Sequence, residues 1–289
     1  MERQMGAALQ VGDNPGNCDN LRVGENQFGK VSGVTLKAAA CQGKTILEDV
    51  SFTAPYKIMK PFEKPDGGIQ VMPLCASAGI MRGDVQQFDY EVCEGADLEL
   101  LSQSFEKIHK MEGGSASRDI QVRVEKNARL SYFPQPVIPF AGSAFDSTME
   151  IRLEDESSQL FLMDILSCGR AASGERFGYR RFSSKVMIWR GDELIYRDNC
   201  RYEPEVMPME DLGMYEGFSH MANIFLTCAG GESARNLQEE IWQILQAEEG
   251  CEGGISQTAS GDLAVRILGN RAQKLQDVAE KIKRRWERK

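Results

Sequence analysis

A repeated pair of short strands constrains the fold of this chain more than any other feature. Three times, apolar and polar residues alternate over a short segment, a polar turn follows, and a second alternating segment comes next. Alternation with a period of two predicts strands that bury one face. The first segments span residues 88–92, 120–124 and 149–153, and the second segments span 98–100, 130–132 and 160–162.

The copies recur at a nearly fixed interval. Leu98 and Leu130 are 32 residues apart, and Leu130 and Leu160 are 30 apart. One copy cannot bury its own apolar residues, so neighbouring copies are expected to stack and close a core between them. We therefore predict a mainly β fold of stacked sheets, β-helical and solenoid-like. A β sandwich built from ordinary hairpins is the alternative that the interval leaves open.

Composition divides the chain into a leader and one folded unit. Residues 1–30 are rich in Gly, Asn, Asp and Gln and have almost no periodic apolar pattern, which predicts a mobile N-terminal leader. The fold is expected to begin near Val31. We predict a single domain over residues 31–289, with a β-repeat core to about residue 205 and a mixed α/β part over 206–289.

The C-terminal part is predicted to contain two α-helices. Leu237, Ile241 and Leu245 have helical spacing behind Ser233, a candidate N-cap, and Gly253-Gly254 is expected to break this helix. A strand is expected over 263–268. A terminal amphipathic helix follows, whose apolar face is formed by Leu275, Val278, Ile282 and Trp286.

The basic end of the chain, residues 281–289, is typical of a solvated helix terminus. The two helices are the elements most easily presented to a helical partner protein, although their apolar faces could instead cover the β core. Upstream, Gly191-Asp192 lies between alternating apolar residues and predicts a tight turn between two strands.

Charge and hydropathy exclude two classes of partner. The chain has 43 acidic residues against 34 basic ones, a net charge of -9. This balance disfavours nucleic acid, whose binders need a dense basic face. No segment approaches the roughly 20 apolar residues that cross a bilayer, and no secretion signal precedes the fold. We therefore expect a soluble, cytoplasmic protein that binds neither nucleic acid nor membranes.

The cysteines and histidines give no sign of a stable metal site. No CxxC pair occurs, so the spacing typical of zinc and iron-sulfur sites is absent from the sequence. In a reducing cytosol we expect most cysteines to be free and buried as small apolar groups. The two histidines, His109 and His220, are too few for a His-rich metal store. The cysteines are Cys18, Cys41, Cys75, Cys93, Cys168, Cys200, Cys228 and Cys251.

Catalytic motifs are likewise absent from the sequence, and only two polar positions stand out. No P-loop, HExxH, GxSxG or GxGxxG motif occurs in the required strand-to-helix context. In segment 169–177, Arg170 and Glu175 could form a buried pair, which would be purely structural or part of a site. Asp84 follows Gly83 on a predicted turn, where its carboxylate could be functional or could simply satisfy the turn.

A proline-rich segment interrupts the second repeat. Residues 133–142 contain three prolines in six positions, which cannot continue a strand ladder. The segment could be a rigid corner or a proline-rich docking surface. We favour the corner because Tyr132, Phe133 and Phe140 look buried.

This segment carries a family resemblance. Residues 130–145 resemble the LxxxPQPxIPFxxxxF stretch of the urease accessory protein UreD family, also called UreH. Segment 169–177 is similar to the family's GRxAxGExF, and the likeness extends from about Val34 to the C-terminus. Where many members have SPGGGLxxGD, residues 72–84 keep Gly83-Asp84 but lose most of the glycines. The matching motif residues are Pro134, Gln135, Pro136, Pro139, Phe140, Gly169, Arg170, Gly174 and Glu175.

The resemblance implies a non-catalytic scaffold that delivers nickel during urease maturation. It implies binding to UreF, recruitment of the UreG GTPase through UreF, docking on apo-urease, and a complex that is dimeric through UreF. It also implies an internal passage for transient nickel, with no tightly bound cofactor. Such a passage needs oxygen ligands that hold a divalent ion weakly. On the matching positions, Asp84 and Glu175 are the candidates.

Two other classes remain open at this stage. A β-helical carbohydrate-active enzyme would need paired carboxylates on one repeated face, and the sequence shows no such ladder. A generic β-solenoid interaction module would share the fold and lack the nickel role.

Overall fold

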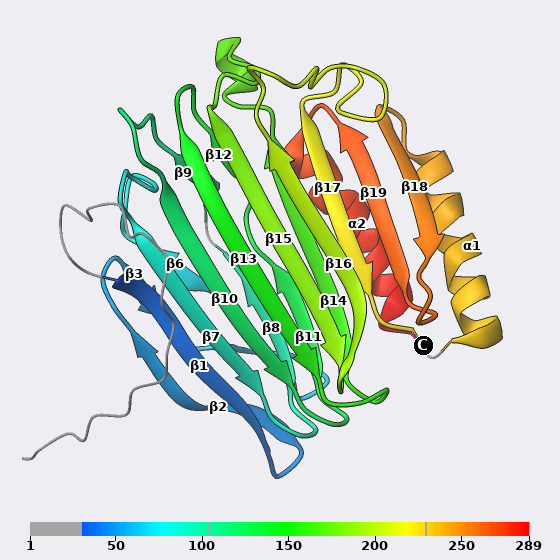
Figure 1. The fold of residues 1–289 in the computed structure, drawn as a ribbon. Helices are drawn as coiled ribbons and strands as arrows, with labels where there is room; N and C mark the ends of the chain where they lie inside the picture. The colour runs from blue at the N-terminus through cyan, green and yellow to red at the C-terminus, as the bar shows by residue number, and fades with distance from the viewer. Residues whose placement is uncertain (1–30, 103, 229, 289) are drawn as a thin grey trace, which may run out of the picture.

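Two open β sheets pack face to face, and two helices cover the outer face of the larger sheet (Figure 1). The computed structural model describes residues 31–102, 104–228 and 230–288. The predicted leader, residues 1–30, lies outside the described residues. The first described element begins at Val31.

The small sheet has seven strands in the order β16-β15-β13-β10-β7-β1-β2. Their bounds are β1 (Val31–Cys41), β2 (Lys44–Phe52), β7 (Val85–Val92), β10 (Ala116–Val124), β13 (Ala144–Leu153), β15 (Arg181–Arg190) and β16 (Glu193–Tyr202). The predicted turn at Gly191 joins β15 to β16 as an antiparallel hairpin.

The large sheet has the main order β18-β19-β17-β14-β11-β8-β5-β4, with two short strands beside it. Its strands are β4 (Phe62–Glu63), β5 (Ile69–Val71), β8 (Asp97–Leu101), β9 (Glu106–Ile108), β11 (Arg129–Phe133), β12 (Val137–Pro139), β14 (Gln159–Ser167), β17 (His220–Leu226), β18 (Cys251–Gln257) and β19 (Leu263–Gly269). A separate pair joins β3 (Tyr56–Ile58) to β6 (Pro73–Cys75). The helices are η1 (Ala171–Ser173), α1 (Gly231–Ala247) and α2 (Ala272–Trp286).

The predicted repeat is visible in the strand pairing. Each copy contributes one strand to the small sheet and the next to the large sheet, as β7 and β8 do. Neighbouring copies pair in parallel, and Leu130 is the register partner of both Leu98 and Leu160. The leucines that defined the interval in the sequence are therefore direct neighbours in the ladder.

The prediction of a mainly β fold is confirmed, but its solenoid-like part is not. The two sheets remain open, because β2 and β16 are the outermost strands of the small sheet and none of the described strands belongs to both sheets. The alternative of ordinary hairpins also fails for the repeats. Parallel pairing between copies is incompatible with a stack of antiparallel hairpins.

Two local predictions for the first C-terminal helix are wrong. The N-cap of α1 is Gly230, and Ser233 lies within the first turn of the helix. Gly253 and Gly254 do not break the helix but lie inside β18, after the helix has ended at Ala247. A Cβ added at Gly253 would lie 3.1 Å from both the Arg266 carbonyl oxygen and the Leu245 side chain. Close packing of β18 therefore accounts for that glycine.

The apolar faces of both helices are buried on the large sheet. Leu237 and Ile241 of α1 and Leu275 and Ile282 of α2 share one buried cluster with residues of β14, β17 and β19. The idea that these faces dock a helical partner is therefore replaced by its alternative, in which they cover the β core. None of the helices among the described residues is long and apolar enough to cross a membrane.

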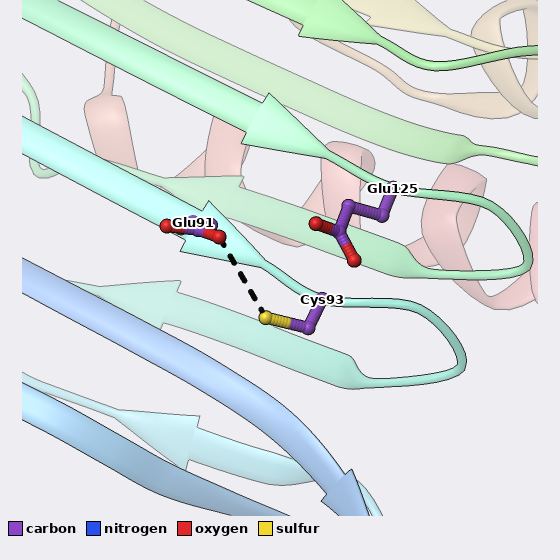
Figure 2. A group of neighbouring side chains, drawn as sticks. All are labelled: Glu91, Cys93 and Glu125. Atoms are coloured by element: carbon purple, nitrogen blue, oxygen red, sulfur yellow. Dashed lines mark hydrogen bonds between the residues drawn. The ribbon is translucent and has the colours of Figure 1, made fainter.

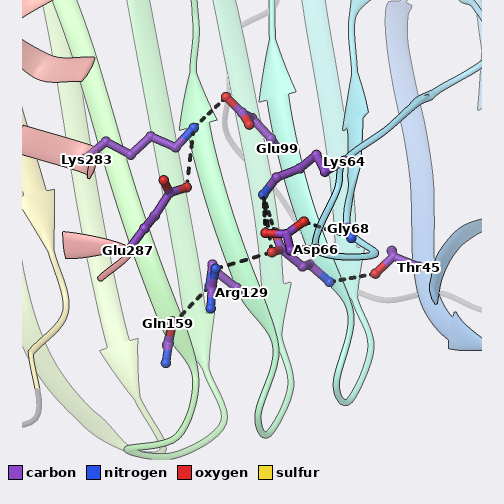
Figure 3. A network of polar contacts seen from close by, with 10 residues as sticks. Thr45, Lys64, Asp66, Gly68, Glu99, Arg129, Gln159, Lys283 and Glu287 are labelled. Atoms are coloured by element: carbon purple, nitrogen blue, oxygen red, sulfur yellow. Dashed lines mark hydrogen bonds and ion pairs between the residues drawn. The ribbon is translucent and has the colours of Figure 1, made fainter. Parts of the chain in front are cut away.

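A buried ion pair fastens α2 to the sheet. Lys283 donates to Glu99 of β8 at 2.6 Å, and their side chains are only 6% and 9% exposed (Figure 3). The Lys283 ammonium also lies 5.0 Å from the centre of the Phe133 ring. The expectation that residues 281–289 are uniformly solvated is therefore wrong for Lys283.

The same outer surface of the large sheet carries further ion pairs. Asp97 of β8 accepts from Lys64 at 3.2 Å and pairs with Arg129 of β11 at 3.4 Å. Figure 3 shows how these contacts connect the β4–β5 turn, the repeat strands and α2. Charged side chains thus link segments that are remote in the sequence.

We predict that Lys283→Met destabilises the fold by about 3 kcal/mol, because it leaves the Glu99 carboxylate buried without its partner. Urea denaturation measures the loss. The double variant Lys283→Met/Glu99→Leu should recover much of it. Arg284→Met, an exposed change on the same helix, serves as the control, and an equal loss in this control would contradict a specific role for the pair.

Candidate functional site

A row of polar side chains crosses the inner face of the small sheet. Its members are direct register partners on successive strands from β1 to β16. The row consists of Ser32, Gln86, Arg118, Ser147, Ser184 and Cys200. Stacking of the repeats aligns these residues, because equivalent positions of neighbouring copies lie side by side in a parallel ladder.

Apolar rows flank the polar row on both sides. One is formed by Phe88, Ile120, Met149 and Val186, and belongs to one buried cluster. The other is formed by Ala116, Phe145, Phe182 and Tyr202, and belongs to a second buried cluster. The polar row therefore separates two apolar regions of the interior. Hydrophobic burial alone does not explain polar residues at this position.

The large sheet adds polar groups opposite the β16 end of the row. Asp164, Asn223 and Arg266 are register partners on β14, β17 and β19. The Asn223 amide donates to Asp164 at 3.4 Å and accepts from Arg266 at 2.8 Å. Burial raises the pKa of Asp164 to about 7, even though the hydrogen bond from Asn223 opposes the shift.

Two residues of β16 complete this group. Arg266 pairs with Asp198 at 3.6 Å, and the Cys200 thiol donates to Asp198 at 3.4 Å. Burial, with Asp198 nearby, raises the pKa of the Cys200 thiol to about 11. Two carboxylates and a neutral thiol therefore lie near one end of the polar row.

A cavity of about 610 Å³ lies at the other end of the row. Ser32, Gln86 and Arg118 of the row line it, together with Tyr56 and Glu106. The Tyr56 hydroxyl is buried and lacks a hydrogen-bond partner of ordinary geometry among the described residues. An unpaired buried hydroxyl is costly, so the cavity offers a polar group to a bound molecule, ion or water.

Arg118 is the charged centre of the cavity. Its guanidinium donates to Gln86 at 2.6 Å and pairs with the Glu106 carboxylate. It also lies between the Phe88 and Phe145 rings, at 5.5 and 5.4 Å from their centres. Burial would lower the pKa of Arg118, but the nearby Glu106 outweighs it and raises that pKa. The cavity therefore contains a permanently charged but neutralised ion pair.

Asp84 lines the same cavity. Its carboxylate accepts the Met81 amide at 2.7 Å, and its own amide donates to the Met81 carbonyl at 3.2 Å. The sequence-based alternative, a turn in which the Asp84 side chain accepts a backbone amide of the same turn, is therefore present. That contact does not exclude a second role, because Asp84 remains at the cavity wall.

Glu175 is not among the residues that line this cavity. One carboxylate oxygen accepts the Ala141 amide at 2.7 Å, and the other accepts Arg170 Nε at 2.9 Å. Burial disfavours the charged form, but these hydrogen bonds outweigh it and lower the pKa of Glu175. The predicted pair with Arg170 is present but is not buried. Arg170 is 49% exposed, and its guanidinium lies 4.5 Å from the centre of the Phe140 ring.

The proline-rich segment forms a corner. The chain leaves β11 after Phe133, passes through Pro134 to Pro136, and re-enters the sheet as β12, which pairs with β9. Gln135 donates to the Ser102 carbonyl at 2.6 Å. Tyr132 and Phe133 are buried as expected, whereas Phe140 is only half-buried, with the Arg170 guanidinium over its ring.

The two glycines of the second motif are required by the backbone conformation and by close backbone packing. A Cβ at Gly169 would approach the Glu175 carbonyl oxygen to 2.9 Å, and Gly174 ends η1 in a left-handed conformation. The matching motif residues therefore build the corner and the loop packed on it, which contains Arg170 and Glu175.

Among the described residues, one group of three side chains has metal-ligand spacing: Glu91, Cys93 and Glu125 (Figure 2). Their potential ligand atoms all lie within 4.8 Å of one another. However, Glu91 pairs with Lys37 at 3.5 Å, and Glu125 accepts the Glu94 amide at 2.8 Å. Glu154 caps the next turn through the Lys126 amide in the same way, so the repeat itself accounts for Glu125.

The cysteines depart from the expectation of general burial. Of the seven described ones, only Cys168 is buried. The reason is their location, since Cys41 ends β1 at the turn into β2, Cys75 ends β6 of the separate strand pair, and Cys200 belongs to the polar row.

The sequence also contained a signal for the polar row, which a search for alternating apolar residues alone did not detect. Gln86, Arg118, Ser147 and Ser184 each lie two residues before the apolar residue that begins the alternation on their strand. A polar residue at one offset in every copy, on the face predicted to be buried, indicates a shared interior feature.

The comparisons with known proteins agree over nearly the whole fold. A family model described as "UreD urease accessory protein" matches residues 31–289. A protein named urease accessory protein UreD from Acetivibrio thermocellus is 38% identical over 90% of this chain and 98% of its own length. One named urease accessory protein UreH from Helicobacter pylori is 35% identical over 90% of this chain and 96% of its own.

We predict that Asp164→Asn stabilises the protein at pH 8 by roughly 1 to 2 kcal/mol, less than the full pKa shift implies because the side chain keeps contact with solvent. The folded-state pKa of about 7 exceeds the ordinary 3.8. The native protein therefore loses stability as the pH rises from 3.8 through 7. Urea denaturation should show a larger gain at pH 8 than at pH 5. A gain independent of pH would contradict ionisation of Asp164 as the cause.

Proposed function

Because the chain belongs to the UreD family of urease accessory proteins, we propose that it is a scaffold that delivers nickel to apo-urease during urease maturation. In this proposal it binds UreF, recruits the UreG GTPase through UreF, and acts in the cytoplasm within a complex that is dimeric through UreF. It has no catalytic activity of its own. GTP hydrolysis belongs to UreG, in keeping with the lack of a nucleotide-binding motif in this sequence.

The polar row through the interior is the observation that carries the nickel role. Nickel is the cargo, and it would enter at the cavity beside Asp84, pass along the row, and leave past Asp164 and Asp198. Single carboxylates, serine hydroxyls and one thiol are ligands that hold a divalent ion without enclosing it. Weak, successive contacts suit a passage, because a closed site with four ligands would retain the ion.

Charge along the proposed route supports cation passage. The guanidinium of Arg118 is already balanced by Glu106, so it leaves no excess positive charge in the cavity. At the far end Asp164 and Asp198 lie near one cation, the half-exposed Arg266 of β19. A divalent cation would therefore meet two acidic groups and one cation at each end of the row, Asp84 and Glu106 with Arg118 at the cavity and Asp164 and Asp198 with Arg266 near β16.

A generic interaction module is the second candidate, and it would use the same fold without the nickel role. A continuous polar row has no purpose in such a module. A carbohydrate-active enzyme is less well supported still, because the relatives carry the name of accessory proteins.

We predict that narrowing the row blocks nickel delivery without dissociating the complex. In a host that lacks this gene, urease should accumulate with little nickel, and the wild-type chain should restore it. Ser147→Leu places a larger apolar side chain in the row and should leave urease nickel-poor. Nickel per urease, measured by mass spectrometry of the metal, and co-purification of UreF are the two readouts.

The matched control is Thr148→Leu, which adds the same side chain to the outer face of the same strand. Full nickel loading with Ser147→Leu would contradict a route along the row, and loss of UreF binding would indicate a folding defect instead.

Glu175→Ala is tested in the same assay. A nickel-poor urease with an intact complex would support a transport role for Glu175, and loss of assembly would assign it to the corner.

A further inference from the structure

The loop between β16 and β17, residues 203–219, projects two aliphatic side chains into solvent. Val206 is 75% exposed and Leu212 is 90% exposed, the two most exposed large hydrophobic residues among those described. Figure 1 shows this loop in yellow-green to yellow at the end of the sheets opposite the β15–β16 hairpin. Single exposed leucines are common, so the surroundings of these two residues decide whether they matter.

Buried side chains and internal hydrogen bonds hold the loop in place. Tyr215 is fully buried and Met209 nearly so, both in the interior cluster at this end of the molecule. The Tyr215 amide donates to the Met209 carbonyl at 3.0 Å, and the Gly213 amide donates to Glu216 at 2.8 Å. Leu212 therefore extends from a braced turn. A side chain held in this way loses little conformational entropy when a partner covers it.

The second family motif forms the base of the loop. Arg176 donates to Glu210 at 2.8 Å and to the carbonyl oxygens of Gly217 and Phe218 at 3.2 and 3.0 Å. The neighbouring Phe177 ring meets the buried Tyr215 ring edge to face at 4.9 Å. Arg176 and Phe177 are thus positioning residues for the loop, and Glu175, beside them, holds the proline corner.

The rim of the loop is acidic. The same loop carries four exposed carboxylates, close in sequence to the two aliphatic side chains: Glu205, Glu210, Asp211 and Glu216. Two ion pairs join the loop to residues outside it, Arg201 with Glu203 and Arg176 with Glu210, and these leave Glu205, Asp211 and Glu216 as further acidic groups. The surface therefore combines apolar anchors with uncompensated negative charge.

We infer that this loop is a docking surface for a partner protein whose apolar pocket is rimmed by Lys and Arg. Charge complementarity favours that occupant over two others. A second copy of this chain would bring the same acidic loop, and anionic membranes would repel it. The inference goes beyond the proposed function, which names partners but no surface, and it uses those partners as probes.

Leu212→Asp in the full chain should weaken binding to either purified UreF or apo-urease by about tenfold or more, as expected for the loss of a central apolar anchor. Leu194→Asp, at the exposed tip of the opposite hairpin, is the matched control and should bind like the wild type. Asp211→Lys should slow association at low salt, with the effect fading at high salt. Surface-immobilised partners and circular dichroism of each variant supply the measurements.

Each outcome decides the inference. Equal binding of the wild type and a folded Leu212→Asp variant to both probes would overturn the docking surface and leave the proposed function intact. If the wild type binds neither probe, the proposed function fails, and with it this choice of partner. Loss of self-association in Leu212→Asp, seen by sedimentation, with unchanged binding to both probes would replace the partner by a second copy.

Discussion

Parallel register between stacked copies is the constraint on which the rest of this structure depends. Because Leu98, Leu130 and Leu160 are register partners, every other position of a copy also lies beside its equivalents. Apolar positions then form continuous rows that close the core. A polar position becomes a polar row, as from Gln86 to Ser184. One pattern of polar and apolar residues, repeated in each copy, thus produces rows that cross the small sheet from strand to strand.

The periodic part of the fold could be predicted from the sequence, and the parts that depend on remote contacts could not. Alternation and the interval predicted the paired strands, since both express local burial. Whether the sheets close depends on contacts between their outermost strands. The spacing of apolar residues in the sequence carries no information on those contacts. Lys283 looked like one cation in a basic run, but its partner Glu99 is 184 residues away. Similarly, Glu175 was recognised as a motif residue, while its bond to the Ala141 amide was visible only in the fold.

The family motifs connect the interior with the surface at one end of the molecule. The proline corner brings Pro134 and Gln135 to the cavity wall, while Glu175 fixes the corner at Ala141. On the other side of the same segment, Arg176 braces the acidic loop that carries Leu212. A partner bound to this loop would therefore lie at the same end of the strands as the corner, and one short segment would support both features.

Anomalous X-ray scattering at the nickel edge, from crystals of the complex with UreF exposed to Ni²⁺, tests the central claim most directly. The account predicts nickel density between the two sheets, along the row from Gln86 to Cys200 and beside Asp164. Nickel confined to the outside of the molecule, for example at Glu91, Cys93 and Glu125, with none between the sheets, would contradict it.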